Sequence, residues 1–541
     1  MIDPSDDQHF RAALRDPGCY ALHAGAGPAV EWIETHISFV ALTGDLVFKL
    51  KKPVRLPFLD FSTRELRRAA CRDEVRLNRR LCPTTYLGIA PLLRDGERLR
   101  MGPLVADVGD GDAETVRNDE VDCAVVMRRL PSDRMLDALL RQNAVTIADV
   151  EGLARTVAAF HQRADRSPQI DALGAPETLA QLASDNFTEI AGIPGHGLSA
   201  ALLAATQRSS ERAFQRLLPR LIARGAEGHI VDGHGDLHAR NVCMTTPPAI
   251  YDCLEFSPRL RCGDVANEVA FLAMDLRHRG AADLARAFVT AYVRESKDAE
   301  IPSLLPPLVS YRAMVRGKVA ALAAADAALS PADRLRASDS AASHLLLAAM
   351  ALAEADGPVW IALCGPPGSG KSTVAKVLRD ATGAAWISTD VLRKRLFGAQ
   401  PTERLPASCY SEDFTQRTYA ATLQAARDAT LEGTASVVLD GNFATPQLRQ
   451  AANAAARAAG AQLVVMHIDV NPTVGLARVT ARMADPARAS DADPTLHEQL
   501  RARFVPPTAA EGLRVVRVDG GDTAVRVAAE GVACFMLPVV G

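Results

Sequence analysis

The two ends of the 541-residue chain differ in how apolar and polar positions follow one another. Short apolar runs that predict strands occur near the start, at His36–Val40, Asp45–Leu50 and Cys123–Met127. The first two flank Thr43-Gly44, which is the pattern of a β-hairpin. Ser62-Thr63-Arg64-Glu65 then has the spacing of a capping box and predicts a helix that ends near Leu81. The chain therefore opens with a strand-rich segment that contains one long helix.

From about Asp133 the apolar positions recur at helical spacing. The segments with this spacing are Ile147–Gln162, Leu198–Arg224, Asn267–Arg279, Tyr311–Ala327 and Pro331–Leu352. Ser330 and Pro331 supply an N-cap and a proline at the first helical position of the last one. A strand-rich start followed by a helical body predicts a two-lobed α+β domain.

After Pro358 the pattern changes to strands that alternate with helices. The predicted strands are Val359–Cys364, Ala385–Ser388, Ser436–Leu439, Gln462–Ile468 and Leu513–Val518. This alternation is typical of a parallel sheet with helices on both faces. The second part is therefore predicted to be an α/β domain.

Composition and charge narrow the class of protein. An apolar content of 48% and a charged content of 23% are those of a globular protein, and the net charge of −3 gives no long-range attraction to nucleic acid. The ten cysteines show no metal-ligand spacing and are expected to be reduced. Because the first ten residues are polar and no apolar run approaches about 20 residues, we expect a cytoplasmic protein without membrane contact.

A first group of chemically informative residues lies in His234-Gly235-Asp236-Leu237-His238-Ala239-Arg240-Asn241. Asp236 and Asn241 are five residues apart, and Asp252 follows a short strand-like segment. In phosphoryl transfer, one loop carboxylate orients the acceptor hydroxyl, while a nearby carboxamide and a second carboxylate bind the magnesium ion that bridges the ATP phosphates. All three side chains are present at suitable spacing.

On these residues, segment 20–345 resembles the aminoglycoside phosphotransferase family, small-molecule relatives of the protein kinases. The HGDxHxxN pattern of the family is matched from His234 to Asn241. The resemblance implies a bilobal protein-kinase-like fold in which Asp236 is the catalytic base and Asn241 and Asp252 bind magnesium. Glycine at position 235, where protein kinases usually have arginine, argues against a protein substrate.

The resemblance also implies a lysine on the third strand that binds ATP and pairs with a helix glutamate. Lys49 is the preferred candidate for this lysine, and Lys51, on the same face of the strand, is its alternative. Glu74 is the preferred partner over Glu65, because the capping box already accounts for Glu65.

A second group of residues forms the GxxxxGKS pattern, directly after an apolar strand and at the start of a helix. Backbone N–H groups of such a loop bind phosphate oxygens, the lysine neutralises the β- and γ-phosphates, and the serine binds magnesium. The residues predicted to bind nucleotide here are Gly365, Gly368, Ser369, Gly370, Lys371, Ser372 and Thr373, with Lys371 also catalytic and Ser372 also a magnesium ligand.

Residues 358–541 resemble the P-loop kinases related to gluconate kinase, chloramphenicol phosphotransferase, zeta-toxin and polynucleotide kinase. By this resemblance Asp440, at the end of a strand, is a magnesium ligand. Asp390 orients the acceptor hydroxyl as a catalytic and substrate-binding residue, and Arg393 binds the substrate. Arg478 and Arg482 are one helical turn apart and are expected to close on the nucleotide phosphates.

The whole chain is similar to bacterial fusions of an aminoglycoside-phosphotransferase-like domain with a P-loop kinase-like domain. The predicted domains are 1–352, with an N-lobe over about 20–130 and a C-lobe over about 131–352, and 359–541. Residues 353–358 form a linker that is short enough for the two domains to be in contact. We expect a kinase that uses ATP, or GTP, with Mg²⁺ at two sites and phosphorylates hydroxyl groups of small molecules.

Two alternatives remain open at this point. One nucleotide site could control the other rather than transfer phosphate itself. The P-loop half could also act on nucleic-acid ends, although its 19 Lys and Arg against 17 Asp and Glu, without an aromatic-interleaved basic stretch, disfavour a polynucleotide acceptor.

Overall fold

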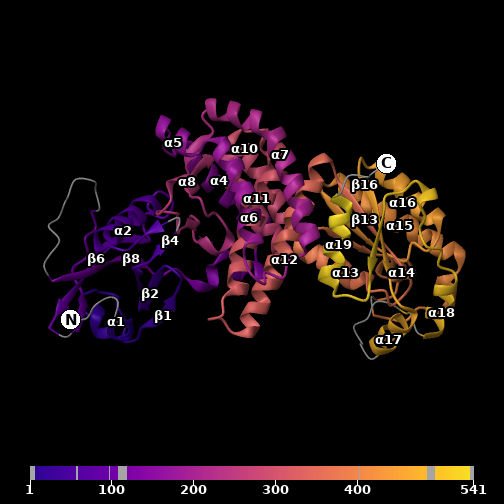
Figure 1. The fold of residues 1–541 in the computed structure, drawn as a ribbon, viewed down its shortest axis with the longest axis horizontal. Helices are drawn as coiled ribbons and strands as arrows, with labels where there is room; N and C mark the ends of the chain where they lie inside the picture. The colour runs from indigo at the N-terminus through magenta and orange to yellow at the C-terminus, as the bar shows by residue number, and fades with distance from the viewer. Residues whose placement is uncertain are drawn as a thin grey trace. The chain divides into compact units, whose positions relative to one another are not determined.

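The structure is a computed structural model that describes residues 7–56, 59–96, 98–107, 119–400, 402–483, 491 and 494–536. It forms two compact units (Figure 1). Unit 1 consists of Met1–Pro176, Ile222–Leu272 and Ala291–Lys297. Unit 2 consists of Glu177–Leu221, Ala273–Thr290 and Asp298–Gly541.

Unit 1 contains a six-stranded antiparallel sheet with the strand order β1-β2-β3-β8-β6-β7. Its strands are β1 Glu31–Glu34, β2 Ser38–Thr43, β3 Leu46–Lys51, β6 Tyr86–Asp95, β7 Arg98–Met101 and β8 Glu120–Arg128. The predicted hairpin is confirmed, since β2 and β3 are joined by a turn in which Gly44 has a φ of +55°. Along β3, Leu46, Phe48 and Leu50 pack into the core with α1 (Asp7–Leu14), so the residues between them face the opposite side.

The long helix α2 (Arg64–Asn78) packs against β6 and β8 on that opposite side. Its N-cap differs from the prediction, because Thr63 rather than Ser62 accepts the hydrogen bond from a helix N–H, that of Leu66. Ser62 instead donates to Asp60. Glu65 therefore occupies the second helical position, where no capping box is possible.

The rest of unit 1 is built from short helices, short strands and parts of longer helices. Entirely within it lie α3 Leu136–Arg141, α4 Ile147–Arg163, α5 Pro168–Leu173, α8 Pro258–Arg261, β4 Arg55–Leu56, β5 Leu59–Asp60, β9 Ile230–Asp232, β10 Val242–Cys243, β11 Ala249–Ile250 and β12 Cys262–Asp264. The helices whose residues are divided between the units are α6 Pro176–Ala191, α7 Ala200–Ala226, α9 Val265–His278 and α10 Ala282–Ser296. Strands β9 and β12 pair antiparallel, and the two pairs β10–β11 and β4–β5 form small hairpins.

Unit 2 contains a five-stranded parallel sheet with the order β14-β15-β13-β16-β17, which confirms the α/β prediction. Its strands are β13 Val359–Cys364, β14 Ala385–Ser388, β15 Ser436–Asp440, β16 Gln462–Asp469 and β17 Val515–Asp519. The helices that alternate with them are α13 Lys371–Thr382, α14 Thr389–Phe397, α15 Glu412–Leu431, α16 Pro446–Ala458, α17 Pro472–Arg482, α18 Pro494–Ala502 and α19 Ala524–Met536. The central strand β13 is fully buried, and its Trp360 donates to Thr430 of α15 at 2.9 Å.

Unit 2 also contains a helical hairpin of α11 (Ile301–Ala325) and α12 (Pro331–Ala353). Helix α12 packs against α13 and α19, and its residues from Leu345 to Leu352 are buried. The predicted linker is a single 3₁₀ turn, Glu354–Asp356, followed by Gly357 at a φ of +121°. This compact unit thus includes residues on both sides of 353–358, and the domain boundaries read from the sequence stay a prediction.

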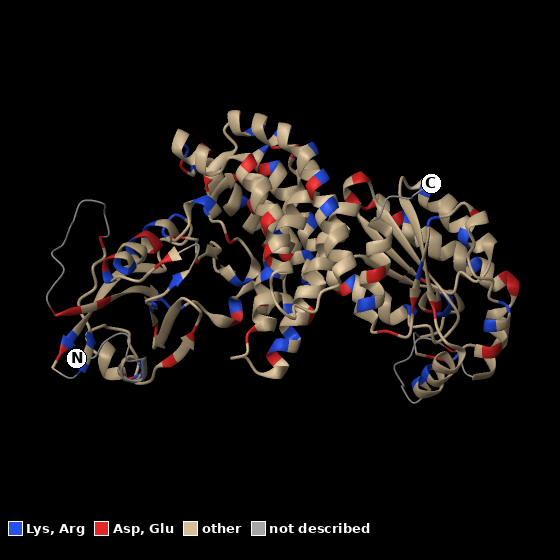
Figure 2. Cartoon of the chain, viewed as in Figure 1, with Lys and Arg blue, Asp and Glu red and all other residues tan. Residues whose placement is uncertain are grey.

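Among the described residues, no helix is both long and apolar enough to cross a membrane. Figure 2 shows acidic and basic residues interspersed along the ribbons of both units.

Two candidate functional sites

The loop after β9 carries the first predicted group of residues. Asn241 folds back on Asp236, donating from its amide nitrogen to the backbone oxygen at 3.0 Å and to the carboxylate at 3.1 Å. The ring of His238 lies 3.3 Å from the same carboxylate. The Asp236 side chain keeps 27% of its surface exposed, so it is both fixed in direction and open to an acceptor.

Glu268, which the motif does not include, fixes the start of this loop. Its carboxylate accepts hydrogen bonds from the backbone N–H groups of His234 and Gly235 and lies 2.8 Å from His161. Burial would raise the pKa of Glu268, but its hydrogen bond and charge interaction with His161 outweigh this and lower it to about 2. His161, a buried residue of α4, also bonds to Tyr292 at 2.7 Å. The loop is thus held by a buried network.

Lys49, Glu74 and Asp252 meet on the α2 side of the sheet. The ammonium group of Lys49 lies 2.9 Å from the carboxylate of Glu74 and 2.6 Å from that of Asp252. Burial disfavours the charge of Lys49, but Asp252 and Glu74 outweigh it and raise the pKa well above its usual value. Asp252 is 45% exposed, whereas Glu74 is completely buried. The predicted lysine and glutamate are therefore in contact, and the lysine also contacts the predicted magnesium ligand Asp252.

Lys51, the alternative lysine, has different neighbours. It donates to the second oxygen of Glu74 and to Glu255, a residue that the sequence reasoning missed. The side chains of Lys51 and Glu255 are 0% and 4% exposed. Lys51 is thus enclosed, while Lys49 faces the open side at Asp252. The early position of Glu65 on α2, where it contacts Arg64, places it away from this cluster.

The donor atoms near Asp252 fit a magnesium ion. The amide nitrogen of Asn241 donates to Asp236, and the backbone oxygen of Asn241 accepts from the N–H of Tyr251, the residue before Asp252, at 3.0 Å. The side-chain oxygen of Asn241 and the exposed carboxylate of Asp252 are therefore oxygen donors from two adjoining segments. Mg²⁺ prefers such oxygens and is usually held by one or two protein groups together with phosphates and water. No cluster of three or more His, Cys, Asp or Glu side chains suited to a metal occurs in the described part of the chain.

The second predicted group joins the end of β13 to the start of α13. Gly365, Gly368 and Gly370 have positive φ values of 154°, 81° and 97°. A Cβ atom on Gly368 would come within 2.3 Å of the carbonyl oxygen of Gly475, so this position requires glycine. The loop therefore presents backbone N–H groups at the N-terminus of α13, as phosphate binding requires.

Lys371, the first residue of α13, folds over the loop. Its ammonium group donates to the carbonyl oxygen of Pro366 at 2.8 Å and to the hydroxyl of Ser369 at 3.3 Å. Burial lowers the pKa of Lys371 to about 8, although Asp440 and Asp390 favour its charged form. A buried lysine with only neutral hydrogen-bond acceptors gains strongly from an anionic ligand.

Asp440 lies at the carboxyl end of β15, next to β13. Burial raises its pKa, although Lys371 and a hydrogen bond from Ser372 oppose this effect. The indole N–H of Trp386 also donates to its carboxylate at 3.2 Å. The two predicted magnesium ligands of the second site, Ser372 and Asp440, both line the same cavity.

A cavity of about 560 Å³ extends from this loop. The predicted residues that line it are Gly368, Gly370, Lys371, Ser372, Thr373, Asp390, Arg393, Asp440 and Arg482. Arg393 is buried and donates to the carbonyl oxygen of Cys409 at 2.5 Å, while its guanidinium lies 4.9 Å from the ring centre of Tyr410. Among the described residues, the Nε atom of Arg393 is buried without a hydrogen-bond partner, and its side chain lines the cavity.

The two predicted arginines of α17, Arg478 and Arg482, have different surroundings in the structure. Arg482 lines the cavity together with Lys371 and Asp390. Arg478 donates to the carbonyl oxygen of Gly520, in the loop after β17, at 2.7 Å. Arg478 also lies beside the phosphate-binding loop, since its guanidinium is 3.7 Å from the position of a Cβ atom on Gly370.

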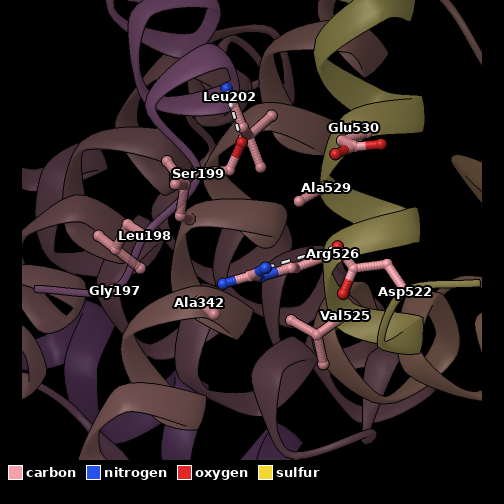
Figure 3. A pocket seen from close by; sticks show the side chains of 11 residues that line it. Gly197, Leu198, Ser199, Leu202, Ala342, Asp522, Val525, Arg526, Ala529 and Glu530 are labelled. Carbon is pink, nitrogen blue, oxygen red and sulfur yellow. Dashed lines mark hydrogen bonds and ion pairs between the residues drawn. The ribbon is translucent and has the colours of Figure 1, made fainter. Parts of the chain in front are cut away.

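A smaller cavity of about 230 Å³ lies between residues of α7, α12 and α19 (Figure 3). It is lined by Gly197, Leu198, Ser199, Leu202, Ala342, Leu345, Asp522, Val525, Arg526, Ala529 and Glu530. Arg526 extends across it towards Ala342 and lies 3.5 Å from Asp522. None of the predicted site residues lines this cavity, so it is not part of either predicted phosphotransfer site.

Two protein families match the chain. The phosphotransferase enzyme family matches residues 61–302, which include Glu74 and the loop from His234 to Asn241. A family of AAA domains matches residues 361–507, which include the phosphate-binding loop. Residues 61–302 and 361–507 thus carry the two kinds of kinase-like phosphotransferase domain.

Solved structures similar to part of the chain include a gluconokinase from Sinorhizobium meliloti 1021, which is 22% identical with a TM-score of 0.24 over 32% of this chain and 92% of that one. A putative kinase from Chloroflexus aurantiacus is 20% identical, with a TM-score of 0.24 over 30% of this chain and 85% of that one.

Similarity over most of the length comes from three relatives. Uncharacterized proteins of Mycobacterium bovis and of two strains of Mycobacterium tuberculosis are each 33% identical over 495 residues, which is 90% of this chain and 93% of theirs. The chain therefore belongs to the family of fusion proteins in which an aminoglycoside-phosphotransferase-like domain is joined to a P-loop kinase-like domain.

Proposed function

We propose that the chain transfers the γ-phosphoryl group of ATP, or of GTP, to hydroxyl groups of small molecules at two Mg²⁺-dependent sites. The observation that carries the proposal is that each site joins a lysine for the phosphates with a carboxylate for the metal. Lys49 lies 2.6 Å from Asp252, and Lys371 lines one cavity with Asp440. Phosphoryl transfer needs positioning and charge neutralisation more than covalent chemistry, and these side chains supply both.

In the first site Asp236 is the catalytic base. The amide of Asn241 orients its carboxylate, which accepts the proton of the acceptor hydroxyl. Asn241 and Asp252 hold Mg²⁺, which neutralises charge on the phosphates when it is bound. Lys49 binds the phosphates and keeps its contact with Glu74.

In the second site the loop Gly365–Thr373 binds the phosphates through backbone N–H groups at the N-terminus of α13, and Lys371 neutralises them. Ser372 and Asp440 hold Mg²⁺, which is supported by their position on the wall of one cavity. Asp390 orients the acceptor hydroxyl and Arg393 binds another part of the acceptor. Arg482 closes on the transferring phosphate from the cavity wall, and Arg478 contacts the nucleotide from its position at Gly520.

One observation favours a second function, in which nucleotide at the P-loop controls the first site. Within unit 2, α12 packs directly against α13, the helix that begins with Lys371. Arg277 of α9 also donates to Thr382 at the end of α13. Both α12 and Arg277 belong to the part of the sequence predicted as the kinase-like domain, so a change in α13 on nucleotide binding would be felt by its helices.

ATP turnover by the full chain tests the proposal against this alternative. The acceptor panel contains hydroxylated metabolites, aminoglycosides and a 5′-hydroxyl oligonucleotide, and the proteins are wild type, Asp236→Ala and Lys371→Ala. We expect the Asp236 variant to lose about a hundredfold or more of one transfer activity, the usual effect of removing a general base. The Lys371 variant should lose a different one.

The outcomes separate the three functions. If Lys371→Ala abolishes the transfer that depends on Asp236, and no acceptor of the second site is found, the control function is favoured. Transfer to the oligonucleotide alone would favour a nucleic-acid end kinase. If both variants keep every activity, the assigned sites are wrong.

A further inference from the structure

A second, completely enclosed lysine and glutamate adjoin the Lys49–Glu74 pair in unit 1. Lys49 and Lys51 are two residues apart on β3 and therefore project to the same face of the sheet. Each donates to a different carboxylate oxygen of Glu74. Lys51 alone continues to Glu255. Glu74 is thus held from two sides, and only one of its lysines also meets a predicted metal ligand.

The surroundings of Lys51 prevent it from reaching a nucleotide. Its side chain is 0% exposed, its ammonium group is satisfied by Glu74 and Glu255, and it lies 5.4 Å from the ring centre of Phe61. A buried ion pair adds little net stability compared with well-packed apolar side chains, because desolvation offsets the attraction between the charges. The Lys51–Glu255 pair should therefore matter more for the position of the segments that it joins than for the stability of the protein.

Glu255 belongs to the segment that carries Asp252, and α2 contacts this segment twice. The backbone N–H of Cys253 donates to the side-chain oxygen of Asn78 at 2.9 Å, and Glu255 is linked to Glu74 through Lys51. Glu74 and Asn78 are one helical turn apart, and the Asn78 amide also donates to the Glu74 backbone at 2.8 Å. One face of α2 therefore holds the metal-binding segment at both ends.

Asp252 itself needs this support. Its φ of +62° is unusual for a residue other than glycine, and its backbone N–H donates to the hydroxyl of the buried Tyr86 at 3.2 Å. A residue in this conformation keeps it only where its neighbours fix the backbone. The hydrogen bonds that the backbone N–H groups of Asp252 and Cys253 donate fix the start of the segment. The Lys51–Glu255 pair fixes its end.

We propose that Lys51 and Glu255 are positioning residues, which lock the segment Asp252–Glu255 to α2 and thereby hold Asp252 in the orientation that binds Mg²⁺. Lys49 and Lys51 then have separate tasks: Lys49 binds the phosphates of the nucleotide, and Lys51 aligns the metal ligand. The inference rests on the proposed function of the first site.

Titration of the full chain with a non-hydrolysable ATP analogue, at a series of Mg²⁺ concentrations and in its absence, tests this division of tasks. All proteins carry Lys371→Ala, so that the signal comes from the first site. We expect Lys51→Met and Glu255→Gln each to raise the Mg²⁺ concentration for half-saturation by about tenfold or more, as is usual when a residue that orients a metal ligand is lost. Their metal-free affinity for the analogue should change by less than about threefold. Lys49→Met should weaken binding in both conditions.

A double variant keeps the test decisive if the single variants unfold. Lys51→Met together with Glu255→Met replaces the pair by two apolar side chains, which should restore the unfolding midpoint without restoring the Mg²⁺ dependence. Wild-type Mg²⁺ dependence in this variant would overturn the inference, and so would an equal loss of metal-free and metal-bound affinity in the single variants. If the Lys371→Ala parent itself binds no analogue, the proposed function of the first site is wrong. This result comes from the parent alone and is therefore distinct from a failure of the inference on Lys51 and Glu255.

Discussion

The guanidinium of Arg277 donates two hydrogen bonds, at 3.1 and 3.3 Å, to the carbonyl oxygen of Thr382, the last residue of α13. The last carbonyl groups of a helix lack partners within it, and a cation at this end also interacts favourably with the helix dipole. Arg277 is held in place by Glu354 at 2.9 Å, which also accepts from the hydroxyl of Ser436 at the start of β15. Arg277 and Glu354 thus connect the C-terminus of α13 with the start of β15. The opposite ends of these two elements carry Lys371 and Asp440.

Replacing Arg277 by alanine should therefore destabilise the P-loop fold. We expect a loss of about 1–3 kcal/mol, the usual cost of removing a charged hydrogen-bond donor from part-buried acceptors. Arg336→Ala is the control in the same unit, because the Arg336 side chain of α12 is 71% exposed in its pair with Asp333 and its loss should cost about 0.5 kcal/mol or less. Urea unfolding measures both, and equal losses would contradict the role given to Arg277.

Gly235 offers a second test, because two glycines of unit 1 share one backbone conformation but not one environment. Gly235 has a φ of +82° and Gly228 a φ of +83°. A Cβ atom on Gly235 would lie 3.0 Å from the Arg261 Cα atom and from the Leu254 side chain, whereas one on Gly228 would meet nothing within 4 Å. Alanine at either position adds the strain of a left-handed residue, about 1 kcal/mol.

Only Gly235→Ala should add a steric cost, of about 1–3 kcal/mol beyond that of Gly228→Ala. It should also reduce the transfer that depends on Asp236, because the displaced loop carries that carboxylate. Unfolding free energies and turnover of the two variants check this. A loss no greater than that of Gly228→Ala would show that the loop has room for a methyl group.

The buried carboxylate of Glu268 predicts how stability depends on pH. Its pKa is lowered from 4.5 to about 2 in the folded protein, so folding favours the ionised form. The resulting contribution, roughly 3 kcal/mol, is fully present above pH 4.5 and is lost as the pH falls from about 4.5 to 2. Glu268→Gln should lower the unfolding free energy at pH 7. It should also make the unfolding free energy fall less steeply between about pH 4.5 and pH 2.

Glu31→Gln serves as the control for this prediction, because the Glu31 side chain is 57% exposed in its pair with Arg129. It should leave the pH profile close to that of the wild type. Unfolding experiments between pH 2 and 7 make the comparison. A profile of Glu268→Gln as steep as the wild-type profile would assign the acid sensitivity to other groups.

The sequence predicts best those residues whose spacing is imposed by local structure. The turn around Gly44, the phosphate-binding loop before Lys371 and the loop carrying Asp236 each depend on neighbouring residues along the chain, and the two families match segments that contain the latter two. The parallel sheet also follows from the alternation of apolar strands with helices.

Residues that act across the fold could not be found in this way. Glu268 contacts the His234 backbone from 34 positions away, and Glu255 meets Lys51 across 204 positions. No fixed spacing marks such pairs, because only tertiary packing brings them together. The choice between Lys49 and Lys51 shows the same limit, since both have the right strand position and only their surroundings distinguish them.

The number of nucleotides bound per chain tests most directly whether the protein holds two separate Mg²⁺-nucleotide sites. Isothermal titration of the full chain with a non-hydrolysable ATP analogue and Mg²⁺ should give two molecules bound per chain. Lys49→Met should leave one, Lys371→Ala should leave the other, and the double variant should bind none. A wild-type chain that binds one nucleotide or none, or a single variant that loses both, would contradict the proposal of two sites.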